Sequence, residues 1–385
     1  MKTNPTKIFA SVLALFAVVC SSGCNIVVDD GSLPDINDII MNENSSSSET
    51  VDSDSSAVNS SSTAESSSEE SPDSSSESQS SSSETQNPAK GNGELSGGLV
   101  IFDDGSTFSL YGGGKTVGQD YAKQLNKFKE LLGDVKVYSL VSPTSGSFYL
   151  PNEYKKYMAS EKDNIDNINS YLSGVTPVDV YSVFEKHKSE YIFFRTDHHW
   201  QPLGAYYAAQ EFAKVAGVSF TPLSEYETVT REGFVGALYH YSNEDSRIKN
   251  HPDTFTYYIP KNSYNVVKYD TQMQTVLNGN VKLPATIDLY DPSEWYLIFG
   301  LDNDIKHVTT DCKNGRKLMI IKDSYGNAFV PYLTSSFEEI IVIDMRNKVN
   351  AVEIAKNYGI TDLVFVMNTF SATGSTNESK LKELY

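Results

Sequence analysis

Two short polar segments carry the side chains best suited to acid–base and nucleophilic chemistry. The first is Asp197-His198-His199, followed by Trp200, in a chain that contains six histidines. In an extended chain, residues two apart project to the same side, so Asp197 is expected to face His199 while His198 points away. A carboxylate in that position holds an imidazole in one tautomer and stabilises its protonated form. The pair therefore has the properties of a general base and its orienting group.

The second segment supplies a candidate nucleophile. Asp323 and Ser324 follow the apolar run 317–321 and precede Tyr325 and Gly326. This order predicts a tight turn between strand and helix that presents the Ser324 hydroxyl, with backbone N–H groups of Ser324 and the next residues available to an oxyanion. Gly326 is expected to let the backbone approach a substrate. The alternative is that Ser324 only caps the following helix.

The elements around these segments are expected to bring them together. The apolar run 191–194 predicts a strand before the first segment, and 317–321 predicts a strand before the second. Ligands of α/β sheets bind outside the carboxyl ends of the strands. Pro202 then begins a predicted helix whose apolar stripe packs on the sheet and fixes the loop before it. Both polar segments are thus expected at one edge of a sheet.

The folded part of the chain, residues 95–385, alternates short β-rich runs with amphipathic helices. Further strands are predicted at 98–102, 135–141, 339–343 and 362–367, and further helices at 117–132, 161–172, 326–333 and 349–358. The first strand, helix and strand predict a βαβ unit, which favours a mainly parallel sheet covered by helices on both faces. Residues 219–311 are aromatic and polar with weak periodicity. They are expected to form an irregular insertion with some β structure, lining one side of this α/β fold.

The N-terminal residues predict export and attachment to a membrane. Lys2 and Lys7 precede the apolar run 8–20, which is too short to cross a bilayer as a helix and is typical of a signal peptide, here residues 1–23. Small residues then lead to Cys24, as in the lipobox of bacterial lipoproteins. Cys24 is therefore the predicted lipidation site. The expected location is the extracellular face of a bacterial cytoplasmic membrane, or the medium if Cys24 is not lipidated.

Residues 24–94 are predicted to be a disordered tether between the lipid and the folded domain. Residues 45–84 contain 22 serines and almost no apolar side chains, so they cannot bury enough surface to offset the entropy of ordering. Most of the formal net charge of −19 lies in the tether, residues 24–94, so this charge says little about the substrate. Because no Lys/Arg-rich cluster is present, nucleic acid is not expected as a partner.

Three segments resemble a known family. TDHHWQPLGAYYAA, IIKDSYGNAFVPYL and VYSLVSPTSGSFYLP are similar to the bacterial DHHW proteins, which resemble the alginate O-acetylation proteins AlgJ and AlgX and share an SGNH hydrolase-like fold with permuted motif order. The resemblance covers roughly residues 97–368. It implies that Ser324 is the nucleophile, His199 the base and Asp197 its orienting carboxylate. Lys322 departs from the family pattern, since many SGNH proteins have Gly there.

The resemblance also implies an activity and further site residues. It implies a serine-dependent O-acetyltransferase or acetylesterase that acts on a cell-wall or secreted polysaccharide without a cofactor, and a membrane acyl-donor protein is a conceivable partner. Arg195 is expected to pair with a carboxylate of either the site or the scaffold. Six residues are candidates for substrate or oxyanion contacts: Trp200, His198, Arg195, Tyr325, Gly326 and Asn368.

Two other functions stay open at this point. The first is metal-dependent hydrolysis by Asp197, His198 and His199, which needs further ligands from other strand ends, whereas the remaining histidines have no such spacing. The second is a non-catalytic carbohydrate-binding module on the scaffold of a former hydrolase, because fold does not fix function. Such a module would bind glycan equally well after Ser324→Ala.

Overall fold

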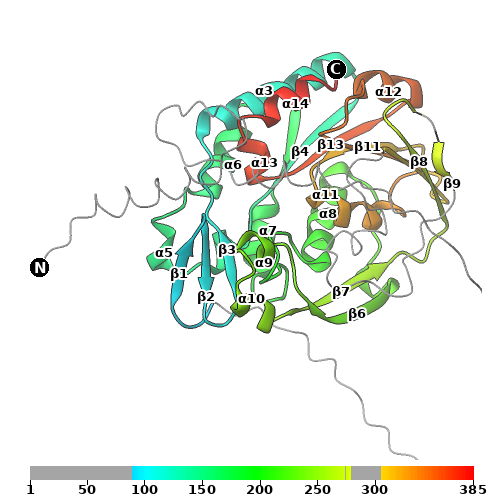
Figure 1. Ribbon diagram of the computed structural model, residues 1–385. Helices are drawn as coiled ribbons and strands as arrows, with labels where there is room; N and C mark the ends of the chain where they lie inside the picture. Colours follow the sequence, from blue (N-terminus) through cyan, green and yellow to red (C-terminus); the bar gives the residue numbers. More distant parts are fainter. Residues whose placement is uncertain (1–88, 274, 279–304) are drawn as a thin grey trace, which may run out of the picture. The chain divides into compact units, whose positions relative to one another are not determined.

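The computed structural model describes residues 89–273, 275–278 and 305–385 (Figure 1). These residues belong to one compact unit. The predicted signal peptide, Cys24, most of the predicted tether and residues 279–304 of the predicted insertion lie outside the described residues. Strand β1 (Gly93–Ser96) already begins before residue 95, so the predicted end of the tether at 94 is too late. No helix in the described ranges combines the length and apolarity needed to cross a membrane.

The largest sheet in the described part of the chain has eight strands. In spatial order they are β5 (Val175–Val178), β4 (Lys136–Ser142), β13 (Asp362–Asn368), β11 (Lys317–Lys322), β12 (Glu339–Asp344), β10 (Ile305–Thr310), β8 (Tyr264–Tyr269) and β9 (Thr275–Asn278). The first five strands are parallel and the last three pair antiparallel. Because β4, β13 and β11 are parallel neighbours, their carboxyl ends lie at the same edge.

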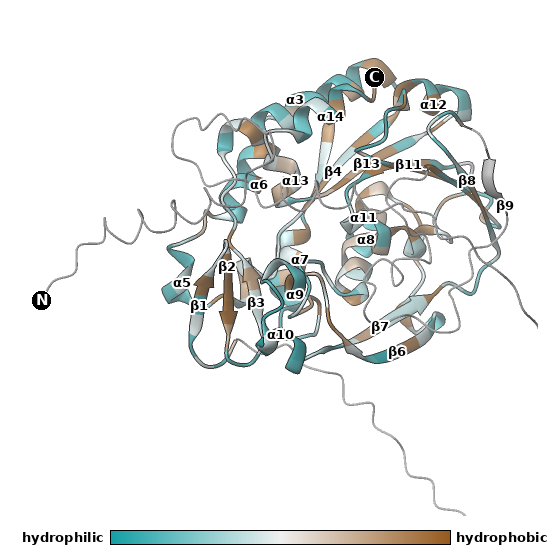
Figure 2. Ribbon diagram, in the orientation of Figure 1, coloured by the Kyte–Doolittle hydropathy of each residue, from teal (hydrophilic) through white to brown (hydrophobic). Residues whose placement is uncertain are grey.

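Helices cover both faces of this sheet, which confirms the predicted three-layer α/β fold (Figure 1). One face carries α3 (Lys115–Leu132), α12 (Ala351–Tyr358) and α14 (Asn377–Lys382), and the other carries α7 (Val180–His187) and α8 (Pro202–Ala216). Successive residues of a strand point to opposite faces of the sheet. In β11, Met319 belongs to the same apolar cluster as the buried residues of α3, and Ile320 belongs to the same cluster as those of α8. Figure 2 shows hydrophilic residues, in teal, along α3 and α12, two helices of the first face.

The remaining helices of the described residues follow the strand ends and loops. They are α4 (Gly146–Tyr149), α5 (Asn152–Lys155), α6 (Glu161–Ser170), α9 (Leu238–Tyr241), α10 (Ser246–Asn250), α11 (Tyr325–Phe329) and α13 (Thr369–Thr373), with 3-10 turns at Leu223–Glu225 and Val330–Leu333. The predicted helix 326–333 is thus a short α-helix continued by a 3-10 turn. Pro331 lies inside that 3-10 turn, where its missing N–H and fixed φ limit a longer α-helix.

The predicted βαβ unit at the start of the domain is wrong. Strand β2 (Leu99–Phe102) does not join the large sheet; it pairs antiparallel with β1 and with β3 (Thr107–Ser109) in a separate three-stranded sheet. The turn Asp103-Asp104-Gly105 connects β2 to β3, and Gly105 has a φ of +78°. An Asp-Gly pair between two apolar runs is a hairpin signal, and it outweighs the strand–helix–strand order.

The predicted strand at 191–194 is also wrong. Ile192, Phe193 and Phe194 are buried in the core beside α7 and α8, but the segment makes only an isolated bridge, Phe193 to Trp200. A four-residue apolar run fits a buried loop as well as a buried strand, so periodicity cannot separate them. The polar segment 195–200 therefore follows a loop and not a strand of the sheet.

The region 219–311 contains β structure, as predicted, but its described part is not one separate layer. Strands β6 (Glu227–Phe234) and β7 (Asp253–Ile259) form a two-stranded ribbon. Strands β8, β9 and β10 instead extend the large sheet beyond β12. The described part of the expected insertion thus contributes both a separate ribbon and the edge of the large sheet.

Candidate functional site

Ser324 lies in a turn directly after β11, at the carboxyl edge of the parallel strands, and begins α11. The side chain makes no capping hydrogen bond to the helix; its Oγ lies 2.7 Å from Nε2 of His199. The two segments selected in the sequence, 125 residues apart, therefore meet. The Ser324 hydroxyl therefore does not cap the helix, in contrast to the alternative interpretation.

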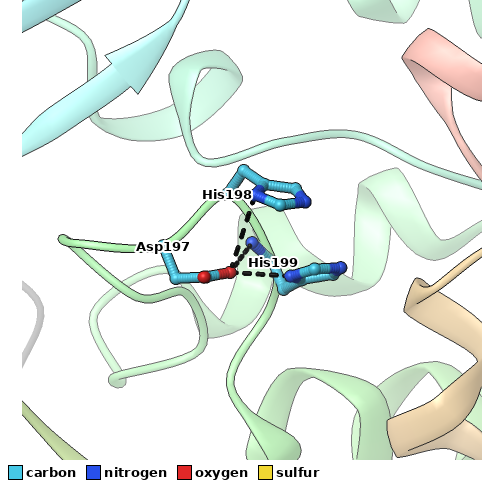
Figure 3. Close-up of side chains that lie close together, drawn as sticks. All are labelled: Asp197, His198 and His199. Carbon is cyan, nitrogen blue, oxygen red and sulfur yellow. Dashed lines mark hydrogen bonds and ion pairs between the residues drawn. The ribbon is translucent and has the colours of Figure 1, made fainter. Parts of the chain in front are cut away.

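A closed loop presents His199. The bridge between Phe193 and Trp200 closes the loop, and Gln201 N–H donates to Ile192 O at 2.9 Å. Inside the loop the His199 N–H donates to Asp197 Oδ1 at 2.9 Å, so the chain bends at a local side-chain turn instead of running extended. The same Oδ1 lies 2.7 Å from His199 Nδ1 (Figure 3). Asp197 and His199 pair as expected, although the predicted geometry was wrong.

The hydrogen bonds fix the protonation pattern of the imidazole. The Asp197 carboxylate can only accept at Nδ1, so Nδ1 carries the hydrogen and Nε2 is left to accept from the Ser324 hydroxyl. Asp197 Oδ2 accepts a further hydrogen bond from Ala237 N–H at 2.8 Å. Burial by itself raises the pKa of Asp197, but the His198 and His199 imidazoles outweigh burial and hold the pKa well below its usual range.

His198 does not point away from this pair, in contrast to the prediction. Its ring centroid lies 3.9 Å from that of His199, and its Nδ1 lies 3.8 Å from Asp197 Oδ1 (Figure 3). The bend at Asp197 causes this, because alternation of side chains holds only in an extended strand. Two imidazoles therefore share one buried carboxylate.

Asp253, at the start of β7, anchors the loop from outside. Its buried carboxylate accepts hydrogen bonds from the backbone N–H of Arg195, the Arg195 Nε at 3.1 Å, and the Thr196 N–H and hydroxyl. Arg195 thus pairs with a scaffold carboxylate and not with Asp197. The role of Asp253 could not be predicted from the sequence, because no motif or spacing connects this residue with Thr196, which lies 57 residues earlier.

Two glycines permit close packing around the site. A Cβ atom at position 236 would lie 2.3 Å from the Asp197 Cβ, and one at position 326 would lie 2.4 Å from the Lys322 Cβ. Gly236 was not predicted. Gly326 makes room for the Lys322 side chain, and the expected approach of its backbone to a substrate stays a prediction. The Lys322 ammonium is itself buried and lies 2.8 Å from Asp344 Oδ2.

Trp200 and Tyr325 tie the two segments together. The indole N–H of Trp200 donates to Tyr325 O at 3.1 Å, and the Tyr325 hydroxyl donates to His198 O. Both side chains are fully buried, with ring centroids 5.0 Å apart. These two candidate contact residues therefore have structural partners, and they keep Ser324 beside His199.

The turn at Ser324 leaves two groups able to meet an oxyanion. Tyr325 N–H donates to Asp323 Oδ1 and Gly326 N–H to Asp323 O, so both are occupied. Among the described residues, neither the Ser324 N–H nor the side-chain NH₂ of Asn368 has an acceptor. The other end of the Asn368 amide, Oδ1, accepts a hydrogen bond from Ser371 N–H and so caps α13. The Asn368 N–H donates to Asp323 Oδ2 at 2.8 Å, which places Asn368 next to this turn. Burial raises the pKa of Asp323.

Asp197, His198 and His199 are also the one group of three potential metal ligands found among the described residues, with the ligand atoms within 4.8 Å of one another. Their atoms are already engaged. Both carboxylate oxygens of Asp197 accept protein hydrogen bonds, and both ring nitrogens of His199 lie at hydrogen-bonding distance from Asp197 and Ser324. A cation would have to displace this arrangement. The donor set fits an oriented imidazole better than a metal centre.

Comparison with known proteins gives the family. The model described as "DHHW protein" matches residues 22–343. The structure of a DHHW family protein from Eubacterium siraeum is 45% identical, covers 77% of this chain and 98% of its own, and has a TM-score of 0.71. PatB1 from Bacillus cereus, seen with a sulfonyl adduct, is 17% identical, with coverages of 72% and 96% and a TM-score of 0.59.

The O-acetyltransferase domain of Pseudomonas putida AlgJ is 14% identical, covers 78% of this chain and all of its own (100%), and has a TM-score of 0.43. No curated protein matches the sequence. The match to the family model and the 45% identity agree with the resemblance carried by the sequence segments around Asp197 and Ser324. The chain belongs to the DHHW family.

Proposed function

We propose that this DHHW protein is a serine-dependent acyltransferase or esterase that moves an acetyl group onto or off a polysaccharide outside the cell. One observation carries the proposal: Asp197, His199 and Ser324 form a continuous row of hydrogen bonds, each 2.7 Å long. This is the arrangement that turns a serine hydroxyl into a nucleophile. The acetyl group and the polysaccharide rest on the resemblance of the sequence segments to alginate O-acetylation proteins.

In the first half-reaction Ser324 takes the acyl group. The Ser324 Oγ attacks the carbonyl carbon of the donor ester while His199 Nε2 accepts the hydroxyl proton. Asp197 stabilises the imidazolium that forms. The Ser324 N–H and the Asn368 amide donate to the oxyanion of the tetrahedral intermediate. When the C–O bond to the donor breaks, His199 returns the proton to the departing alcohol, and acyl-Ser324 remains.

In the second half-reaction the acyl group leaves Ser324. A hydroxyl group gives its proton to His199 Nε2 and attacks the acyl carbon, and the Ser324 oxygen recovers the proton as it departs. A sugar hydroxyl in this role makes the protein a transferase, and water makes it an esterase. The same side chains serve both outcomes, so the acceptor decides between them.

A sulfonyl fluoride tests whether Ser324 is activated, since it reacts with nucleophilic serines. Phenylmethylsulfonyl fluoride is expected to modify Ser324 in the wild-type protein, and His199→Ala is expected to slow the reaction by about 10³-fold or more. Ser142→Ala, at the end of β4 and two strands away from β11 in the sheet, is the matched control and should react as the wild type does. Peptide mapping locates the adduct. Modification at any other residue, or an unchanged rate in His199→Ala, contradicts the proposal.

Insensitivity to chelators separates this mechanism from metal-dependent hydrolysis. We expect hydrolysis of p-nitrophenyl acetate to continue at the same rate after dialysis against EDTA, because both ring nitrogens of His199 have protein partners. Loss of the activity with EDTA and its return with zinc would show instead that Asp197, His198 and His199 bind a cation.

We also propose that the protein works at the outer face of the membrane, held by lipid on Cys24. The proposal rests on the sequence alone: a short apolar run followed by small residues and Cys24. Cys24→Ser is expected to abolish incorporation of radiolabelled palmitate and to leave the folded domain unchanged. Continued labelling of Cys24→Ser would contradict it.

A further inference from the structure

A segment outside the predicted site, residues 236–245, is fastened to the Asp197 loop. Gly236 N–H donates to the Thr196 hydroxyl at 2.9 Å, Ala237 N–H to Asp197 Oδ2 at 2.8 Å, and Leu238 N–H to Thr196 O at 3.1 Å. Three consecutive backbone donors thus position the loop that carries His199. The segment continues as α9, so the residues one turn later are held close to the same loop.

Tyr241, at the end of α9, brings an aromatic ring to the site. Its ring centroid lies 5.9 Å from that of His198, whose ring in turn lies 3.9 Å from His199. The Tyr241 side chain is half-buried, and its inner part packs against a small apolar cluster around Leu238 and Ile248. The rings of Tyr241, His198 and His199 therefore form a row that leads from a partly exposed surface to the Ser324 hydroxyl.

The chain after Tyr241 is held in a strained shape. Asn243 and Glu244 have φ angles of +57° and +64°, two consecutive non-glycine residues in the left-handed region. Backbone hydrogen bonds keep them there: Asn243 N–H donates to His240 O, and Glu244 N–H to Tyr239 O at 2.9 Å. Such conformations persist where the surroundings enforce them, and they are concentrated at ligand-binding segments. The strained turn therefore fixes α9 and the ring it carries.

We propose that Tyr241 and His198 form the acceptor subsite, where the flat Tyr241 ring stacks on the apolar C–H face of a pyranose. The inference rests on the proposed acyl transfer and names its acceptor as a sugar ring. A rigid, partly exposed aromatic ring offers a large contact area at low entropic cost, and the neighbouring imidazole is a polar group that can bind a hydroxyl. A sugar stacked on Tyr241 would lie next to the ring that contacts His198, whose own ring lies 3.9 Å from His199.

Competition between two acceptors tests the subsite. The mature protein is acetylated with p-nitrophenyl acetate in the presence of methanol and one methyl pyranoside from a set of four, the glucoside, galactoside, mannoside and N-acetylglucosaminide. The yields of methyl acetate and acetylated sugar give the preference for a ring over an alcohol too small to stack. Variants are Tyr241→Phe, which keeps the ring; Tyr241→Leu, which keeps apolar packing; and Tyr171→Ala, which removes an exposed tyrosine in the loop after α6.

The wild-type protein is expected to prefer at least one pyranoside over methanol. Tyr241→Leu should lose about threefold to tenfold of that preference, the size of an aromatic stacking contact, whereas Tyr241→Phe and Tyr171→Ala should keep it. Melting curves show whether Tyr241→Leu is folded. A wild-type protein that becomes acetylated but shows no preference, or an equal preference in Tyr241→Leu, overturns the subsite and leaves the proposed function intact. Absence of acetyl-Ser324 in the wild type overturns the proposed function itself.

Discussion

At the scale of single residues, Asp197 has the most demanding position in the site. It is a buried carboxylate that binds His199 through one oxygen and Ala237 N–H through the other, and it lies close to a second imidazole. Taking a charge out of water is costly unless hydrogen bonds and opposite charges compensate for it. Here His199 and the Ala237 N–H donate hydrogen bonds to the carboxylate, and the neighbouring His198 and His199 imidazoles hold the pKa of Asp197 low in spite of burial.

The change Asp197→Asn tests the orienting role. The amide keeps the size of the side chain but places an NH₂ group or a neutral oxygen at His199 Nδ1, so the favoured tautomer and the stabilisation of the imidazolium are lost. We expect kcat for hydrolysis of p-nitrophenyl acetate to fall by about 10³ to 10⁴-fold with little change in KM. A fall of less than tenfold would show that His199 does not depend on Asp197.

The stability of the wild-type protein should reflect the same carboxylate. Because the folded-state pKa of Asp197 lies below its unfolded value of about 4, ionisation of Asp197 stabilises the fold above that pH, and the contribution is lost as the pH falls through the folded-state pKa. The difference in unfolding free energy between the wild type and Asp197→Asn should thus be largest above about pH 5 and shrink in more acidic solution. Urea titrations from pH 6 down to pH 3 measure this difference, and a difference that grows on acidification would contradict the assigned shift.

The sequence predicted the side chains of the hydrogen-bonded row better than the groups that support them. Asp197 and His199 lie two residues apart, and the family resemblance linked them to Ser324, which follows a strand. Asp253 and Ala237 act from 57 and 40 residues away. Ala237 acts through its backbone N–H, which every residue except proline has, so its residue type could not reveal its role.

At the scale of elements, the site depends on the contact between the Asp197 loop and the segment that begins at Gly236. The two backbones come so close that a single added methyl group would overlap the Asp197 side chain, as the 2.3 Å distance shows. The same segment provides the N–H groups that orient Asp197 and Thr196. A small change here should therefore move the loop without touching the core.

The substitution Gly236→Ala is predicted to reduce activity more than stability. The methyl group pushes Asp197 away from His199, so kcat should fall by about 10²-fold, the cost of a displacement of about 1 Å in a positioned group. Gly112→Ala is the control, because a Cβ atom at position 112 has no neighbour within 4 Å. Hydrolysis rates and melting temperatures of both variants check the prediction, and equal activities would contradict it.

The ends of β11 and β12 are joined by a buried ion pair just before Ser324. Lys322 and Asp344 are both fully buried, and Arg346 binds the same carboxylate at 2.6 Å. Lys322→Met removes one cation from a buried network, and we expect the unfolding free energy to fall by about 3 kcal/mol. The control is Lys317→Met at the other end of β11, where the partly exposed pair with Glu339 should contribute at most about 1 kcal/mol. Urea denaturation compares the two losses, and similar losses would contradict the account.

Four of the five parallel strands of the large sheet, β4, β11, β12 and β13, could be predicted from the sequence, because strands such as β11 and β13 have a short apolar run at their centre. The fifth parallel strand, β5, and the antiparallel strands β8, β9 and β10 were not predicted. The errors at β2 and at residues 191–194 have one physical cause. A buried apolar run shows only that the segment is inside the protein, whereas its pairing partner depends on turns and distant strands. The two errors did not affect the candidate site, because hydrogen bonds, and not strand pairing, hold the Asp197 loop beside Ser324.

At the scale of the whole molecule, the described domain builds the candidate site at one edge of the sheet from four separate parts of the chain. The Asp197 loop, the segment at Gly236, the turn after β11 and the end of β13 at Asn368 all converge there. We therefore expect a variant lacking residues 24–88 to retain the acetylation rate of Ser324 within about twofold, since their predicted role is that of a tether.

The central claim is that Ser324 becomes acylated with His199 as its base. The most direct measurement is the intact mass of the mature protein after incubation with p-nitrophenyl acetate, with Ser324→Ala and His199→Ala treated in parallel. The account predicts one added acetyl group in the wild type, located on Ser324 by peptide mapping and missing from both variants. A wild-type mass that does not change, or an acetyl group that persists in Ser324→Ala, would contradict it.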